Sequence, residues 1–177
     1  MNQVKQQYKD ILENNLSRMA TDMIINDAGD DPEKFGILAD FILTGEEPLP
    51  SRAAWVIEGI DARHPDLITP YLTPFIKAIP RFKHLGTTRN VLKILSRNNI
   101  PKKLHGKLID QCFELLQDRK APVAIQVYSM QIISNLADCY PEIMQELREV
   151  LESRMNSSLP GFKSRAKKIL KKSRPPY

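Results

Sequence analysis

Three basic side chains, Arg89, Lys93 and Arg97, recur at intervals of four residues and form the clearest chemical pattern in the sequence. On a helix this spacing places them on one face. Like charges at this spacing weaken a helix by roughly 0.2–0.5 kcal/mol per pair. The pattern is typical of a solvated outer face, and the functional alternative is a helix face that contacts an acidic group.

These three residues belong to a long stretch that lacks acidic side chains. Between Leu67 and Ile109 there is no Asp or Glu but nine Lys or Arg, and a second basic run follows Glu152 and includes Arg174. Residues 1–50 carry 4 basic and 10 acidic side chains, whereas residues 51–177 carry 22 and 11. Basic stretches of this kind are typical either of a surface that binds an acidic partner or of a solvated face. The candidate contacts with a protein partner or with phosphate are Arg81, Lys83, Arg89, Lys93, Arg97, Lys102, Lys103, Lys163, Lys167, Lys168 and Lys171.

The residue types that usually carry out catalysis do not form a recognisable motif. The histidines His64, His84 and His105 lack the spacing of a metal site. Neither a Gly-x-Ser-x-Gly elbow nor a glycine-rich phosphate loop occurs. Cys112 and Cys139 have no partner at metal-ligand spacing, and we interpret both as small core residues. We therefore expect a protein without enzyme activity, cofactor or metal.

Helices must position the basic residues, because the apolar residues recur at helical spacing. Residues 51–79 predict two short helices joined at His64-Pro65, which are too short to bury their apolar faces alone. The same pair then recurs: Ile57 of the first helix corresponds to Ile94, 37 residues later, and to Ile132, 38 residues after that. In the second helix Leu72 corresponds in the same way to Ile109 and Leu147. A helix-pair period of this length predicts an all-α, right-handed α-α superhelix, a solenoid of about four helix pairs.

The order of signals along the chain predicts one domain over residues 1–177. We expect N-terminal capping helices in residues 1–30, helix pairs in 31–155, a C-terminal capping helix in 162–172 and a tail in 173–177. Val4, Tyr8, Ile11, Met19 and Met23 would form the apolar face of the N-terminal cap.

Individual residues predict where some of the helices begin. Asp31-Pro32-Glu33 combines an N-cap side chain, a first-turn proline and a first-turn acid, so a helix should start there. Pro70 and Pro74 predict that the second helix of the first pair starts at Thr69 or is kinked.

Two helix openings carry a resemblance to known repeat proteins. The segments Asp118-Arg-Lys-Ala-Pro122-Val123 and Ser51-Arg52-Ala53-Ala54, with their 37- to 38-residue repeat, resemble HEAT-like (armadillo-type) proteins over about residues 31–172. More narrowly, SRAAWVIEGID followed by a proline-opened helix is similar to small bacterial HEAT-like proteins, some of which carry a transferred adenylosuccinate lyase label. The Ser-rich Met-Pro-x-Lys-x-Asn loop of that lyase superfamily has no counterpart here, so we expect no lyase activity.

Trp55, the only tryptophan, has two interpretations. It corresponds to Leu92 and Met130 in the repeat, which indicates a core position. The alternative is a groove position with Arg52, Glu58 and Asp61. This would resemble the HEAT-like DNA glycosylases, in which aromatic and acidic side chains hold a damaged nucleotide on a concave basic surface. That family carries several groove tryptophans, whereas this chain has one.

The sequence as a whole favours a non-enzymatic interaction module that presents a helical-repeat surface to an acidic protein. Nucleic-acid binding through backbone phosphates is the alternative. No segment reaches the roughly 18 apolar residues of a membrane span, and the N-terminal segment lacks the apolar stretch of a signal peptide. We therefore expect a soluble, cytoplasmic monomer.

Overall fold

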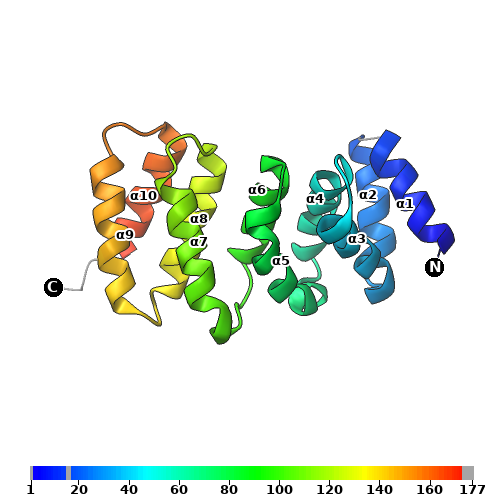
Figure 1. Ribbon diagram of the computed structural model, residues 1–177, viewed down its shortest axis with the longest axis horizontal. Coiled ribbons are helices and arrows are strands. Elements are labelled where there is room, and N and C mark those ends of the chain that lie inside the picture. Colours follow the sequence, from blue (N-terminus) through cyan, green and yellow to red (C-terminus); the bar gives the residue numbers. More distant parts are fainter. Residues whose placement is uncertain (1, 15–16, 173–177) are drawn as a thin grey trace. The chain divides into compact units, whose positions relative to one another are not determined.

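A computed structural model describes residues 2–14 and 17–172 of the protein. Those residues form ten α-helices and three short 3-10 helices, and they contain no strand. The predicted all-α repeat fold is therefore confirmed. The chain divides into two compact units, residues 1–94 and 95–177, and each is described below by itself (Figure 1).

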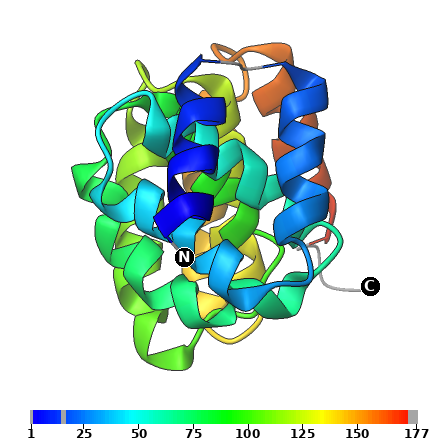
Figure 2. The same cartoon turned by 90° about the vertical axis from the view of Figure 1, so that its right-hand side faces the viewer.

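The first unit is built around one central helix. Its elements are α1 (Asn2–Asn14), α2 (Arg18–Ala28), α3 (Pro32–Thr44), α4 (Leu49–Asp61), η1 (Pro65–Tyr71), α5 (Leu72–Ala78), η2 (Ile79–Arg81) and α6 (Leu85–Leu95), whose last residue belongs to the second unit. Helices α1, α2 and α3 all pack on α4, and Figure 2 views this unit from the side of α1 and α2. Ala53, Val56, Ile57 and Ile60 of α4 are consequently fully buried.

The predicted helix start at Asp31 is confirmed. The Asp31 carboxylate accepts hydrogen bonds from the backbone N–H groups of Glu33 and Lys34 at 2.9 and 3.1 Å, which satisfies two of the free donors at the start of α3. Ser17 caps α2 in the same way, accepting the N–H of Ala20 at 3.1 Å. These side chains fix where the helices begin.

The two prolines of the first helix pair change the type of helix. Residues Pro65–Tyr71, which include Pro70, form a 3-10 helix, and the α-helix begins only at Leu72. Pro74 then lies in the first turn of α5, where its missing N–H leaves no hydrogen bond unmade. The predicted regular helix is thus reduced to the seven residues of α5, preceded by a tighter segment.

The second unit also has a central helix. It contains η3 (Lys102–Leu104), α7 (His105–Gln117), α8 (Val123–Leu136), α9 (Pro141–Arg154) and α10 (Pro160–Lys172). Helix α8 packs on α7, α9 and α10 (Figure 1). Ile125, Met130 and Ile133 of α8 are fully buried as a result. The helix opening predicted at Pro122 is confirmed, since Pro122 is the N-cap of α8. Pro141 is the first residue of α9.

The repeat register correctly predicts most of the core. Ile57, Ile94 and Ile132 are at most 1% exposed, and Leu72, Ile109 and Leu147 are buried as well. The prediction is wrong for two residues of the N-terminal segment, since Met19 is 72% and Met23 58% exposed. Helix α2 instead turns Ala20, Ile24 and Ile25 toward α4. The apolar set of α2 is therefore offset by one residue from the expected one.

Two carboxylates, those of Asp27 and Asp40, bind side chains of α1. Protonation of these carboxylates in acid should weaken both contacts. The Lys34 ammonium lies 2.7 Å from one oxygen of Asp27, whose other oxygen accepts the Tyr8 hydroxyl of α1. Lys5 of α1 lies 2.7 Å from Asp40 of α3. The bonds from Lys34 and Tyr8 lower the pKa of Asp27 below its usual 3.8, and the bond from Lys5 lowers that of Asp40.

A carboxyl group whose pKa is lowered on folding stabilises the fold above its unfolded pKa and loses this effect as pH falls through the folded value. We therefore expect the free energy of unfolding, measured with urea, to decrease as pH falls below about 4, and to decrease less in the Asp27→Asn variant. Asp22→Asn is the control, because Asp22 forms only a surface pair with Arg18 at 3.8 Å. An equal pH dependence of the wild type and Asp27→Asn would contradict the assignment.

Candidate functional site

Trp55 departs from the repeat pattern. Its equivalents Leu92 and Met130 are fully buried, whereas Trp55 is 37% exposed. The core interpretation of Trp55 is therefore wrong. Of the residues named in the groove interpretation, Arg52 lines the same pocket as Trp55, whereas Glu58 and Asp61 do not, and Asp61 is buried. The neighbours of Trp55 on α4, Ala54 and Val56, face the core, and the indole projects into an open pocket between α4 and the start of α6.

This Trp55 pocket has a volume of about 400 Å³. Three segments of the first unit form it: the loop before α4, the first half of α4, and residues 84–90. Its walls are Glu47, Pro48, Ser51, Arg52, Trp55, His84, Gly86, Arg89 and Asn90. Both arginines and His84 therefore lie around one aromatic side chain.

Local hydrogen bonds hold the polar residues of the Trp55 pocket in place. Arg52 donates from Nη1 to the carbonyl oxygens of Leu12 and Glu13, the latter at 2.8 Å. His84 accepts the backbone N–H of Gly86 at Nδ1, at 3.0 Å, so a neutral His84 carries its proton on Nε2 and can donate to a ligand. Arg89 is exposed, and its one hydrogen bond with another described residue is a long one, from Nε to Asn90 at 3.4 Å.

Two more of the predicted basic residues line a neighbouring pocket of about 430 Å³. Arg81 and Lys83 lie on the short segment between α5 and α6, and both are exposed. Apolar residues, among them Ile42 and Phe82, form the rest of this pocket together with Glu46 and Glu47. Because Glu47 lines both pockets, the structure brings Arg81, Lys83 and Arg89 to adjoining parts of one unit.

The predicted stripe of Arg89, Lys93 and Arg97 does not form as expected. Lys93 lies 2.8 Å from Glu58 of α4, whose side chain is only 13% exposed, so Lys93 joins α6 to α4. Helix α6 ends at Leu95, and Arg97 follows in the second unit. Of the three residues, Arg89 is the one that lines the Trp55 pocket.

The remaining predicted residues belong to the second unit. Lys102 and Lys103 are exposed on η3, and Lys167, Lys168 and Lys171 are exposed on α10. Lys163 is half-buried and donates to the carbonyl oxygen of Asn156 at 3.3 Å. Arg174 and the predicted tail of residues 173–177 lie outside the described residues.

Comparison with known proteins identifies the family. The model of the HEAT repeat domain family matches residues 8–173, which is most of the chain. The chain belongs to the HEAT repeat domain family. No curated protein and no solved structure matches it significantly. The family match is therefore consistent with the all-α repeat fold. HEAT repeats typically form surfaces for protein interactions.

The histidines of this HEAT repeat protein have local, structural partners. His105 is buried, with Nε2 2.8 Å from the carbonyl oxygen of Ile100 and Nδ1 3.2 Å from the Tyr140 hydroxyl. His64 lies 3.1 Å from Asp30. Cys139 is exposed rather than part of the core, whereas Cys112 is fully buried, and burial raises the pKa of its thiol. Among residues 2–14 and 17–172, no three His, Cys, Asp or Glu side chains are grouped as a metal site would need, and no helix is long and apolar enough to cross a membrane.

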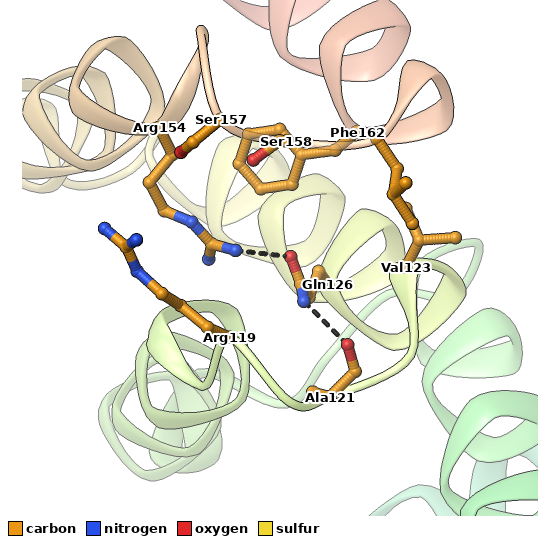
Figure 3. Close-up of a pocket in the computed structure, with 9 residues that line it drawn as sticks. Arg119, Ala121, Val123, Gln126, Arg154, Ser157, Ser158 and Phe162 are labelled. Atoms are coloured by element: carbon orange, nitrogen blue, oxygen red, sulfur yellow. Dashed lines mark hydrogen bonds between the residues drawn. The ribbon is translucent and has the colours of Figure 1, made fainter.

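Sequence reasoning missed Arg154, at the end of α9. Arg154 is only 8% exposed and lies in a pocket of the second unit (Figure 3). The repeat register contained a signal for it, because Ile79 and Leu116, both buried, correspond to Arg154 at the same shifts of 37 and 38. A charged residue at a repeat position that is apolar in the other helix pairs indicates that this helix pair has a different local structure.

Proposed function

We propose that this HEAT repeat protein is a non-enzymatic interaction module that binds an acidic segment of a partner protein at the Trp55 pocket. The observation that carries the proposal is the exposure of Trp55 at a repeat position whose equivalents, Leu92 and Met130, are fully buried. Tryptophan and arginine are enriched among the residues that dominate the energy of protein interfaces. Trp55 and Arg89 supply both types at one place.

The charge around the pocket indicates the chemistry of the partner. Four basic residues, Arg52, Arg81, Lys83 and Arg89, line the Trp55 pocket and its neighbour, against the two acids Glu46 and Glu47. Complementary charge accelerates association and selects the partner more than it raises affinity. The expected ligand is a segment with one apolar side chain, which packs on the indole, flanked by carboxylates.

Nucleic-acid binding is the second candidate, and the C-terminal helix favours it. Helix α10 exposes Lys167, Lys168 and Lys171, and it contains no acidic residue. Contacts with phosphates would need no aromatic platform, and Phe162 of the same helix is fully buried and unable to stack on a base. Such binding would be electrostatic and independent of the Trp55 pocket.

A fluorescence titration tests the proposal directly, because Trp55 is the only tryptophan in the chain. We expect a short peptide with one leucine between glutamates to shift the Trp55 emission to shorter wavelength as the indole loses contact with water. A peptide with lysines in place of the glutamates should give no shift. Arg89→Gln should weaken binding of the acidic peptide by roughly three- to tenfold through the loss of one charged contact.

Arg18→Gln is the matched control, because it removes the same charge from a side chain that is 91% exposed on α2, away from the pocket. Equal weakening by Arg18→Gln and Arg89→Gln would contradict a defined site. Generic duplex and single-stranded DNA form the second arm. If DNA binds without a change in Trp55 emission and log K falls with log salt at a slope of about −4 or steeper, the nucleic-acid candidate replaces the first.

A further inference from the structure

A small pocket in the second unit has two arginines and no acid among its lining residues. The loop between α7 and α8, the first residues of α8, the end of α9 and the turn into α10 enclose a volume of about 130 Å³ (Figure 3). Its walls are Arg119, Ala121, Val123, Gln126, Arg154, Ser157, Ser158, Leu159 and Phe162. We call it the Arg154 pocket.

Arg154 is a buried charge with neutral partners. Its Nη1 donates to the carbonyl oxygen of Leu116, its Nη2 donates to Oε1 of Gln126 at 2.8 Å, and its guanidinium lies 4.7 Å from the centre of the Phe162 ring. A guanidinium has five N–H donors, so these bonds leave donors that a bound anion can use. Buried charges are normally paired, and the partners of Arg154 are a carbonyl, an amide and a ring.

Arg119 adds a second charge of the same sign. It projects from the α7–α8 loop toward Arg154 across the rim of the pocket (Figure 3). Burial, and then the charge of Arg119, lower the pKa of Arg154, while Asp118 acts in the opposite direction. The Asp118 carboxylate accepts the N–H of Lys120 at 2.8 Å. Within the described part of the chain, neither arginine forms an ion pair with a carboxylate.

The opposite wall supplies neutral donors. The hydroxyls of Ser157 and Ser158 line the pocket, and α10 begins just beyond them at Pro160. The positive end of the α10 dipole is therefore at the pocket wall. Leu159, on the same wall, is 64% exposed. An anion in the pocket would meet two guanidinium groups, two hydroxyls and a helix N-terminus, with an apolar side chain at the entrance.

We propose that the Arg154 pocket binds the phosphoryl group of a phosphate monoester. The pocket holds one small group, and the two charges of a phosphate monoester match the two guanidinium groups, whereas a carboxylate carries one charge. A phosphodiester carries substituents on two of its oxygens. A monoester carries one, which can extend out of the pocket past Leu159. This inference is independent of the Trp55 pocket, which belongs to the other unit.

Amide signals of the ¹⁵N-labelled full chain, followed during titration with phenyl phosphate, test the proposal. We expect the signals of Ser157, Ser158 and Gly161 to shift in a saturable way, at constant ionic strength. Arg119→Gln should weaken binding about tenfold or more, as expected for one charge-assisted contact of about 1.4 kcal/mol. Because Arg119 is exposed and makes no hydrogen bond with another described residue, the variant should fold normally.

Lys120→Gln is the matched control: Lys120 is the next residue, is exposed and does not line the pocket. If Lys120→Gln weakens binding as much as Arg119→Gln, or if benzoate binds as tightly as phenyl phosphate, the proposal is wrong. Absence of saturable shifts at the pocket would also overturn it. Inorganic phosphate distinguishes the source of the ligand: equal affinity indicates a free phosphate site, and tighter binding of phenyl phosphate indicates an ester whose substituent contacts Leu159.

Discussion

Replacing Phe75 by alanine should lower the free energy of unfolding by about 3 to 5 kcal/mol, the usual cost of removing a buried aromatic ring from a core. Phe75 is fully buried in α5, with its ring 6.2 Å from that of Tyr71, which in turn lies 5.4 Å from Phe35 of α3. The three rings connect α3, η1 and α5. A helix of seven residues cannot form on its own in water, so this contact should hold α5 in place.

Urea unfolding followed by circular dichroism measures the effect of Phe75→Ala. Lys77→Ala is the control, because Lys77 is exposed on the same helix two residues later, and its change should stay within about 0.5 kcal/mol. Similar losses for the two variants would show that α5 is not held by its buried face. That result would also count against the repeat register, in which Phe75 corresponds to Cys112, a buried residue 37 positions later.

The second large effect concerns Arg154. Replacing it by leucine should cost roughly 2 to 6 kcal/mol, since it leaves two buried acceptors without a partner, at about 1–3 kcal/mol each. The two acceptors are the carbonyl oxygen of Leu116, near the end of α7, and Oε1 of Gln126 on α8. Gln126 extends this hydrogen-bond network to the loop between α7 and α8, because its Nε2 donates to the carbonyl oxygens of Asp118 and Ala121 at 3.2 and 2.7 Å.

A double-mutant cycle distinguishes the energy of the Arg154–Gln126 hydrogen bond from the energy of side-chain packing. If the hydrogen bond matters, Arg154→Leu combined with Gln126→Leu should cost less than the sum of the two single changes, because the double variant leaves no unpaired Gln126 oxygen. Arg119→Leu should leave stability nearly unchanged, since it removes a like charge near Arg154 and no hydrogen bond. Strict additivity in the cycle would contradict the role assigned to the Arg154–Gln126 contact.

Much of the fold could be predicted from the sequence because local signals and the repeat agree. Asp31, Pro122 and Pro141 each mark a helix start through backbone chemistry that does not depend on distant residues. The 37- to 38-residue period then identifies the core, since one helix pair has to bury its apolar face against other helices. Pro70 indicated an irregular second helix, but its effect, a 3-10 segment, depends on how that segment packs.

The candidate sites were harder to predict because exposure is decided by packing between helices. Trp55 has the hydrophobic character of its equivalents Leu92 and Met130, yet it is 37% exposed in a pocket that residues from three segments line. For Arg154 the residue type predicts an exposed position, whereas its contacts with Leu116, Gln126 and Phe162 accompany burial. Arg97 was placed on a helix that ends two residues earlier, and helix ends are the least certain part of any pattern.

Arg52 connects α1 with the Trp55 pocket. The same guanidinium that lines the pocket donates to the carbonyl oxygens of Leu12 and Glu13, in the last turn of α1. A carboxylate that drew Arg52 into the pocket would leave that turn without its cation, so a ligand at Trp55 and a docked α1 would each weaken the other. By linkage, the two effects are equal in size. If the Trp55 pocket binds a carboxylate as proposed, docking of the N-terminal helix would therefore oppose that binding through Arg52.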